Sequence, residues 1–427
     1  MATVFTPHRP EELSEIVRWA AANATPLRVL GRDSKGGLGR PVPAEHELSL
    51  AGFSGVSGYE PSELILTAGA GTPLAEIEAL LAENGQMLAF EPPDHARLFR
   101  ASTSPPTGNA EQPERTGTFG ATLGGTLGGT VASNLSGPRR FLAGAARDHF
   151  LGFRAVNGRG EAFKAGGRVV KNVTGFDLPK LLAGSWGTLA ALWEVTVKVM
   201  PVPEFSCTLL VFGLDDTGAN RLMSTAAASA HVVSGAAHLP ARVAARSAVV
   251  KAAGQAVTAL RVEGPELSTR HRVAALKTLL TDGGRAGIEC DELDHPATLA
   301  LWREIGDLAL LPVGGEREIW RLALPPASAP GVIGHLEKMA SASAWLQDQA
   351  GGALWLSCPA GIADAQLRSA LLPGGGHATL WCASAARRAA VPVFHPQSPA
   401  LAALTRRVKA SFDPRAVLNP GRMYSDI

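Results

Sequence analysis

The stretch TLGGTVASNLSGPRR, residues 126–140, decides the fold of this chain. Its paired glycines, Gly128 and Gly129, allow the main chain to approach a bulky ligand closely and can adopt positive φ angles. Three apolar side chains that favour burial interrupt it, namely Leu127, Val131 and Leu135. A flexible Gly/Thr linker is the alternative, but a linker would not be expected to carry those side chains. The stretch is therefore interpreted as a ligand-binding loop.

Upstream, the chain alternates helix and strand. An amphipathic helix is predicted over residues 10–23, followed by a short strand at 27–30 and another at 64–68. Between the first two strands lies Gly-Arg-Asp-Ser-Lys at residues 31–35, where small residues can point several backbone N–H groups at phosphate oxygens. A polar surface turn is the alternative. After the second strand, Thr72 is predicted to cap a helix, with Pro73 in its first turn and Gly85 just past its end.

Downstream, strand-like segments occupy residues 151–156 and 161–164. A further strand-like segment has residues 193–199 as its last part. Between them lie KNVTGFDL at 171–178 and GSWGTL at 184–189. A lysine and an aspartate in such a stretch are costly to bury unless they are paired or bonded to a ligand. A surface ion pair with a glycine turn is the alternative for any one of these residues.

Two prolines, Pro201 and Pro203, mark the expected boundary between domains. Beyond it, three apolar-rich runs are predicted strands, at 207–213, 319–324 and 353–356. Ala-rich helices such as 221–232 and 270–281 separate them. This order predicts an α+β second domain with an antiparallel sheet. The Pro- and Thr-rich residues 92–118 are predicted to form a long surface loop.

Composition excludes several classes of function. The 427 residues, with 46% hydrophobic and 18% charged side chains, suit two domains with sizeable cores. A net charge of +2 gives no electrostatic argument for nucleic acid or an acidic membrane surface. The four cysteines are scattered, so no metal site or iron–sulfur cluster is expected. No apolar run of about 18 residues suggests a membrane span, and a cytoplasmic location is the expectation.

The ligand-loop segments, taken in order, resemble the FAD domain of the vanillyl-alcohol-oxidase/p-cresol-methylhydroxylase (PCMH) type over roughly residues 5–203. In their amino-acid sequence, these segments resemble more closely the FAD-binding E subunits of bacterial glycolate oxidases. Residues 128–140, 145–148 and 169–178 carry this resemblance, as do two distal motifs, GGHATL at 375–380 and FDP…LNPGR at 412–422. The resemblance implies a two-subdomain FAD-binding domain over 1–203, divided near residue 58, and an α+β cap domain over 204–427.

The resemblance also assigns cofactor-binding residues. Backbone N–H groups of Arg32, Asp33, Ser34 and Lys35 would face the FAD pyrophosphate. The residues that would line the pyrophosphate and ribityl chain are Gly128, Gly129, Ser133, Asn134, Ser136, Gly137 and Gly144. Those that would lie along the flavin or adenine edge are Thr188, Leu189 and Ala191. No histidine lies in the first loop, so a non-covalent FAD is expected.

The chain departs from the family pattern at two positions. The family usually has Gly-Gly-Gly-Ser in the first loop, whereas this chain has Arg32 and Asp33 in place of the second and third glycines. Ala190 stands where a glycine usually follows Thr-Leu. Neither departure abolishes a cofactor site, but both could lower its affinity for FAD.

Catalytic residues are not identified. The H-x-G-D-G-N-x-H segment of the D subunits and of D-2-hydroxy-acid dehydrogenases is missing, and 374–377 is the nearest stretch. The resemblance therefore implies a flavin-carrying subunit that oxidises a small 2-hydroxy acid together with a catalytic FAD subunit and an iron–sulfur subunit. Those partners could hold it peripherally at the inner membrane. Two alternatives stay open: a self-sufficient FAD-dependent 2-hydroxy-acid dehydrogenase using His377, Arg303 or Arg321 for the carboxylate, and a scaffold with a vestigial FAD site.

Overall fold

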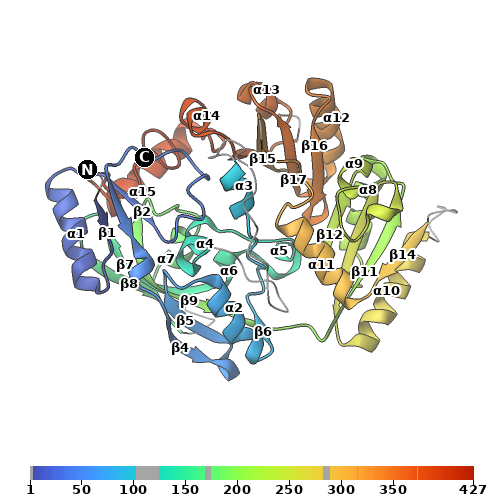
Figure 1. Ribbon diagram of the computed structural model, residues 1–427, viewed down its shortest axis with the longest axis horizontal. Helices are drawn as coiled ribbons and strands as arrows, with labels where there is room; N and C mark the ends of the chain where they lie inside the picture. Colours follow the sequence, from blue (N-terminus) through green and yellow to red (C-terminus); the bar gives the residue numbers. More distant parts are fainter. Residues whose placement is uncertain (1–2, 102–124, 169–174, 282–288, 315, 373) are drawn as a thin grey trace, which may run out of the picture. The chain divides into compact units, whose positions relative to one another are not determined.

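The computed structural model describes residues 3–101, 125–168, 175–281, 289–314, 316–372 and 374–427. These residues form two compact units (Figure 1). The first unit comprises residues 1–136, 144–202 and 384–427, and the second comprises 137–143 and 203–383. Most of the predicted loop at 92–118 and the motif residues 169–174 lie outside the described residues.

The first unit begins with a small parallel sheet of order β1-β3-β2. Its strands are β1 (Val4–Phe5), β2 (Leu27–Leu30) and β3 (His46–Ser49). Helix α1 (Pro10–Ala22) packs on this sheet through Leu13 and Val17, which share a buried cluster with residues of β2 and β3. The amphipathic pattern and the short strand that follows it are thus confirmed.

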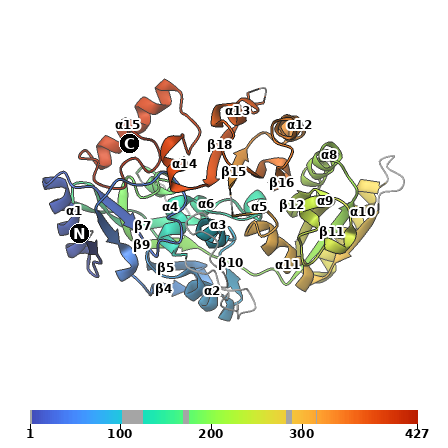
Figure 2. The same cartoon turned by 45° about the horizontal axis from the view of Figure 1, so that its top comes forward.

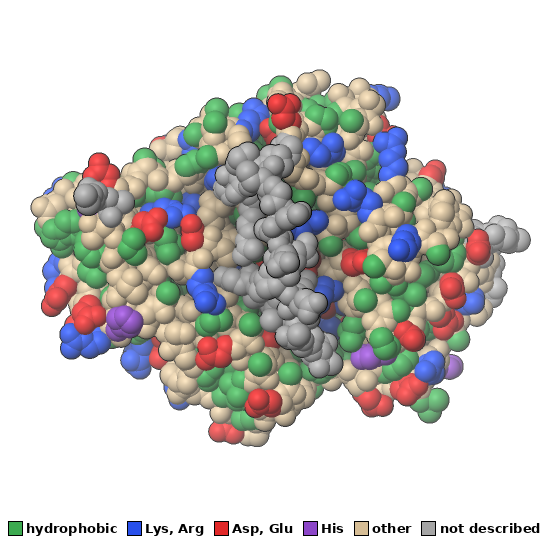
Figure 3. All heavy atoms as spheres, in the orientation of Figure 1, with side chains coloured by type: hydrophobic (Ala, Val, Ile, Leu, Met, Phe, Trp, Pro, Cys, Tyr) green, Lys and Arg blue, Asp and Glu red, His purple; other side chains and the backbone are tan. Residues whose placement is uncertain are grey.

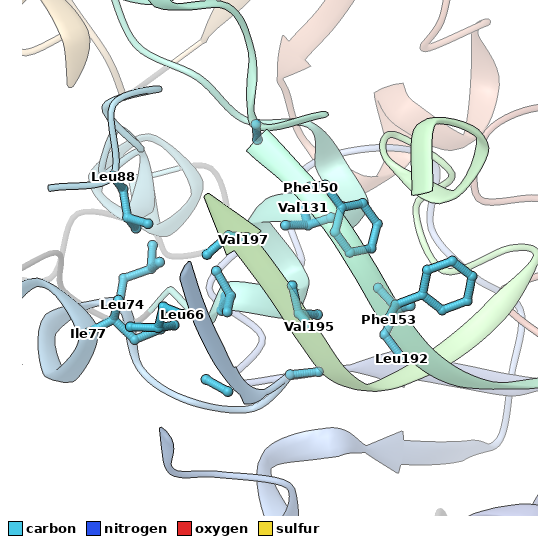
Figure 4. Packing of buried hydrophobic residues seen from close by; sticks show 14 of the residues in the cluster. Leu66, Leu74, Ile77, Leu88, Val131, Phe150, Phe153, Leu192, Val195 and Val197 are labelled. Carbon is cyan, nitrogen blue, oxygen red and sulfur yellow. The ribbon is translucent and has the colours of Figure 1, made fainter. Parts of the chain in front are cut away.

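A five-stranded antiparallel sheet of order β4-β5-β9-β7-β8 forms the rest of this unit's frame. Its strands are β4 (Val56–Glu60), β5 (Ile65–Gly69), β7 (Phe150–Asn157), β8 (Ala162–Gly166) and β9 (Ala190–Lys198). A separate two-stranded antiparallel sheet pairs β6 (Gln86–Met87) with β10 (Met200–Pro201). Figure 4 shows Leu66, Val195, Val197 and Phe150 of the sheet packed with Leu74 and Ile77 of α2.

Seven helices are assigned among the described residues of the first unit after α1. They are α2 (Leu74–Glu83), α3 (Ala96–Ala101), α4 (Leu127–Ser133), α6 (Ala146–His149), α7 (Leu178–Leu182), α14 (Ala385–Ala390) and α15 (Pro399–Phe412). Two local predictions need correction. Thr72 does not cap α2, because its hydroxyl bonds Gly69 O at 2.7 Å and Pro73 takes the cap position. Residues 127–133 are helical rather than an open loop.

The second unit is built on an eight-stranded sheet whose neighbouring strands all run antiparallel, in the order β14-β11-β13-β12-β16-β17-β15-β18. Figure 2 labels β11, β12, β15, β16 and β18 of this sheet. The strands are β11 (Phe205–Phe212), β12 (Val233–Leu239), β13 (Val257–Gly264), β14 (Cys290–Leu293), β15 (Arg317–Ala323), β16 (Ala344–Asp348), β17 (Ala353–Pro359) and β18 (His377–Cys382). The helices are α5 (Arg140–Ala143), α8 (Asp216–Ala227), α9 (Ala241–Ala244), α10 (Glu266–Thr281), α11 (His295–Gly306), α12 (Ala329–Met339) and α13 (Asp364–Ser369).

Helices α8 and α10 bury Leu222, Met223 and Leu276 against Leu209 and Leu260 of this sheet. The predicted α+β class with an antiparallel second sheet is confirmed. Helix α8 begins five residues before the predicted start at 221, because the side chain of Asp215 accepts a bond from Gly218 N at 2.7 Å and caps the helix earlier.

The C-terminal residues 384–427 belong to the first unit, whereas sequence reasoning grouped them with the second. The reason is a set of bonds that no local pattern reveals. Leu27 N donates to Val417 O at 2.7 Å, and Asn419 N donates to Leu27 O at 3.0 Å. The last residues therefore run beside β2, although the chain passes through the whole second unit before it reaches them.

No described helix has the length and apolar character needed to cross a membrane. In the space-filling view, basic and acidic side chains are interspersed with apolar ones over the coloured surface (Figure 3). This distribution agrees with the small net charge of +2.

Candidate functional site

A pocket with about 850 Å³ of empty space, part of it open to solvent, lies within the first unit. Four stretches far apart in sequence line it. They are residues 28–35, residues 126–133 of α4 and its cap, residues 185–192 and, from the C-terminal end, Asn419 and Arg422. The first and second stretches meet directly, since a Cβ added to Gly31 would lie 2.7 Å from Thr126 Oγ1.

The first loop, residues 31–35, turns at Asp33, whose φ is +55°. This left-handed conformation is the one that glycine usually supplies, and aspartate tolerates it better than most residues. The Asp33 carboxylate accepts a bond from Arg28, which also binds Glu47 at 2.6 Å. The departure from the family's glycines is therefore accommodated by a local ion pair.

The backbone N–H groups of this loop are available for a ligand. Within the described residues, those of Arg32, Asp33, Ser34 and Lys35 donate to no protein acceptor. Arg32 and Asp33 are exposed, whereas Ser34 and Lys35 are half-buried, and buried or half-buried N–H groups are nearly always paired. A turn with successive free N–H groups forms a concave site suited to an anion such as a diphosphate.

Lys35 adds a cation to the same site. Its ammonium lies 3.7 Å from the position of a Cβ on Gly129 and 3.5 Å from that on Gly125, and the described chain offers it no hydrogen bond or ion pair. Burial lowers the pKa of Lys35 to about 8, although the charge of Asp94 acts in the opposite direction. An unpaired ammonium in such surroundings favours an anionic ligand.

Arg422 is a second buried cation, with 9% of its surface exposed. Its Nη2 donates to Lys35 O at 3.0 Å, so it supports the first loop from behind. Burial, and then the like charges of Arg28 and Arg388, lower the pKa of Arg422 to about 10. Four cationic side chains (Arg28, Arg32, Lys35 and Arg422) and one carboxylate (Asp33) thus line the pocket, which leaves a positive surplus.

The two glycines of α4 have different roles. A Cβ on Gly128 would lie 2.6 Å from Ala70 Cβ, so Gly128 lets the helix pack closely on the end of β5. A Cβ on Gly129 would meet only Thr126 Oγ1 at 3.1 Å and Lys35 Nζ at 3.7 Å. Gly129 therefore leaves space beside the Lys35 ammonium.

Seven of the predicted site residues line the pocket: Arg32, Asp33, Ser34, Lys35, Gly128, Gly129 and Ser133. Three others form the turns that follow α4. Asn134 ends α4 with φ +50° and accepts a bond from Arg147 N at 3.0 Å, and Ser136 accepts one from Ala146 N at 2.9 Å. Gly144 adopts φ +86° beside Asp148. Gly137 belongs to the stretch grouped with the second unit.

One predicted residue of β9, Ala191, does not line the pocket. Ala191 lies in the buried cluster with Leu13 and Val17, whereas Ala190 and Leu192 line the pocket. Successive side chains of a strand point to opposite faces, which explains the alternation. Thr188 and Leu189 are buried just before the strand, and Thr188 Oγ1 donates to Ser185 O at 2.6 Å.

Sequence reasoning assigned no role to the C-terminal motif, although it noted the motif. Asn419 accepts a bond from Val29 N at 2.8 Å and donates to Trp186 O at 2.8 Å, so it joins two walls of the pocket. Lys409 Nζ donates to Thr188 O, to Leu418 O and to Asp413 at 2.7–2.8 Å. The polar residues Asn419 and Arg422 in the distinctive Leu-Asn-Pro-Gly-Arg run were the sequence signal that could have indicated a role in the pocket.

Comparisons with known proteins identify the family of this chain. A family described as FAD binding domain matches residues 1–98. Glycolate oxidase subunit GlcE of Escherichia coli (strain K12) is 31% identical over 426 residues, which cover 98% of each chain. The chain belongs to the GlcE family of glycolate oxidase subunits. It is accordingly an FAD-dependent oxidoreductase of the FAD-linked oxidase type, with FAD as its cofactor.

More distant relatives match part of this chain or share its fold. Glycolate oxidase subunit GlcD of Bacillus subtilis (strain 168) is 28% identical over 209 residues, 48% of this chain and 38% of that one. The structure of p-cresol methylhydroxylase with substrate bound superposes with a TM-score of 0.66 at 13% identity, covering 99% of this chain and 88% of the other. At that identity the likeness shows the fold alone, and it is the expected PCMH type.

Proposed function

We propose that this chain is the flavin-carrying subunit of a glycolate oxidase-type complex that oxidises a small 2-hydroxy acid, glycolate to glyoxylate. The observation that carries the proposal is that, among the described residues, nothing accepts a hydrogen bond from the N–H groups of residues 32–35 or pairs with the neighbouring Lys35 ammonium. Likeness to a GlcE subunit over 98% of the chain supports the complex.

In this proposal the first loop and Lys35 hold the diphosphate, Gly129 leaves it room, and Ala190 and Leu192 offer apolar walls to the remainder. When bound, the isoalloxazine supplies the hydride acceptor, while the protein supplies position and electrostatics. Asn134, Ser136, Gly137 and Gly144 hold the turns that follow α4. The catalytic FAD subunit and the iron–sulfur subunit would take over substrate oxidation and electron transfer.

The test is a tagged full-length chain purified alone and together with co-expressed GlcD-type and iron–sulfur subunits. We expect a yellow protein in both cases, with flavin absorbance bleached by glycolate only when the partners are present. A colourless chain that still assembles would support the scaffold alternative and overturn the proposal.

One observation favours the self-sufficient dehydrogenase as a second candidate. The Arg321 guanidinium in the second unit has no hydrogen bond or ion pair within the described chain, and it lies 5.6 Å from the centre of the Trp355 ring. Burial and the like charge of Arg140 lower its pKa to about 10. A carboxylate would pair with Arg321. If the chain alone is bleached by glycolate or D-lactate and Arg321→Gln abolishes this bleaching, the second candidate replaces the first.

A further inference from the structure

Trp186 has an unusual backbone conformation. Its φ is +58°, in the left-handed region that bulky residues rarely adopt. The flanking Gly184 and Gly187 also have positive φ angles, +78° and +70°. Four residues, 184–187, therefore form a tight turn in which the tryptophan occupies the variable position of the Gly-Ser-x-Gly-Thr-Leu motif.

Three contacts from separate segments of the first unit hold Trp186 in this conformation. Its N–H donates to Ala132 O at 2.8 Å, and its carbonyl accepts a bond from Asn419 Nδ2 at 2.8 Å. Its indole meets the Phe394 ring edge-on, with centroids 5.2 Å apart and planes at 65°. A strained residue that its surroundings fix so completely is typical of ligand-binding sites.

Trp186 is half-buried and is one of the residues that line the pocket. Among the described residues that line this pocket, Trp186 is the only one with an aromatic side chain. The other lining residues are glycine, aliphatic, polar or charged, so no other described wall residue offers a π-face to a flat ring. Stacking of a nucleotide base on an aromatic side chain improves affinity by about 5- to 150-fold.

We propose that the Trp186 indole stacks on a flat heteroaromatic ring of the dinucleotide and so determines which ring systems this pocket accepts. The inference rests on the proposed FAD site and adds to it the residue that recognises a ring rather than the diphosphate. The first loop and Lys35 bind the charged centre, and Trp186 provides specificity for an aromatic end group.

The test uses the full-length chain stripped of flavin, with FAD, ADP and FMN as probes. The variants are Trp186→Leu, which removes the π-face, and Trp186→Phe, which retains one. Trp193→Leu is the matched control, because Trp193 is also half-buried in the first unit but packs against the core cluster of α1 and does not line the pocket. Dissociation constants, melting temperatures and emission of indole and flavin are measured.

We expect Trp186→Leu to weaken FAD by about 5- to 150-fold, Trp186→Phe by much less, and Trp193→Leu to change the melting temperature only. If the stacked ring is adenine, we expect Trp186→Leu to bind ADP more weakly than the wild type. In Trp186→Phe, ADP should no longer alter indole emission. If the stacked ring is the isoalloxazine, we expect Trp186→Leu to bind FMN more weakly than the wild type. In Trp186→Phe, bound FMN should be more fluorescent.

Equal affinity of wild type and Trp186→Leu for all three probes would overturn the inference. Should Trp186→Leu not fold, unchanged emission and affinity in Trp186→Phe with both half-ligands would overturn it instead. Failure of the FAD-site proposal has a separate signature, because the wild-type chain would then bind none of the probes.

Discussion

At the scale of residues, the pocket depends on a few groups left without protein partners. The Lys35 ammonium and the backbone N–H groups of residues 32–34 donate to no acceptor in the described chain. Ser34 and Lys35 are half-buried, and unpaired donors in such surroundings destabilise the protein unless a ligand compensates them. Their arrangement around Gly129, rather than the number of glycines, supports the proposal that this loop binds a diphosphate.

The pKa of Lys35 predicts how FAD binding depends on pH. With the pKa lowered to about 8, the ammonium is charged at neutral pH and neutral above pH 9. We expect FAD affinity to be constant below pH 7 and to fall above pH 8, by up to about tenfold per pH unit. Fluorescence titrations over pH 6–10 measure this dependence.

Lys35→Met should bind FAD weakly at every pH and lose the pH dependence, while Lys164→Met, which changes an exposed lysine of β8, should behave as wild type. The sign for stability of the FAD-free chain is opposite. Because the folded pKa lies below the ordinary value of 10.5, stability should rise between pH 8 and 10.5. A flat affinity profile in the wild type would contradict the placement of Lys35.

The adjacent glycines of α4 should respond differently to substitution. Gly128→Ala places a Cβ 2.6 Å from Ala70 Cβ, so we expect a loss of about 1–3 kcal/mol in unfolding free energy. Gly129→Val fills the space beside Lys35, and we expect at least tenfold weaker FAD binding with a smaller loss of stability. Urea unfolding and flavin titration measure the two effects.

Gly334→Val is the control for placing a β-branched residue inside a helix, because a Cβ on Gly334 in α12 meets nothing within 4 Å. Because valine is a slightly better helix former than glycine, the substitution should change the unfolding free energy by under about 1 kcal/mol without a net loss, and it should leave FAD affinity unchanged. Unchanged flavin occupancy in Gly129→Val would show that the cofactor does not pass this helix.

At the scale of elements, the C-terminal segment completes the pocket. Helix α15 ends in a buried pair, Lys409 and Asp413, whose side chains are 6% and 0% exposed. Asp413 also accepts bonds from Val417 N and Leu418 N. The pair fixes the turn that brings Asn419 and Arg422 to the pocket wall, so a structural interaction supports a binding function.

We expect Lys409→Met to destabilise the chain by about 3–5 kcal/mol, because it leaves the Asp413 carboxylate buried and unpaired. The double variant Lys409→Met/Asp413→Asn should recover part of this loss, since the remaining amide is neutral. Chemical unfolding with tryptophan emission measures the free energies. A single variant that costs no more than an exposed lysine change, such as Lys164→Met, would contradict the assignment.

At the scale of the whole molecule, the first unit is assembled from three separate parts of the chain, 1–136, 144–202 and 384–427. The pocket draws on the first two parts and on the last few residues of the third. Ligand binding should therefore couple segments that are almost 400 positions apart in the sequence.

Hydrogen exchange tests this coupling. On addition of FAD we expect slower exchange together in residues 31–35, 126–133, 185–187 and 419–422, because binding stabilises every segment that forms the site. Helix α10 in the second unit serves as the reference, since none of its residues lines the pocket. Protection confined to residues 31–35 would show that the pocket is not one site.

The sequence alone determined the element types and much of the site. Helical spacing gave α1, alternation and β-branched residues gave β5, β7 and β9, and the glycine run located α4 and the first loop. These features are local, because propensity, capping and periodicity act over a few residues. The family pattern also identified FAD, since its motifs recur in order along the chain.

Tertiary structure decided what depends on contacts between distant residues. Only the fold shows that residues 384–427 return to the first unit, that Asn419 joins Val29 to Trp186, and that Ala190 rather than Ala191 meets the pocket. A strand's register exchanges its two faces for a shift of one residue, and no local signal fixes that choice. The lowered pKa of Lys35 likewise arises from burial, which the assembled pocket creates and the sequence does not display.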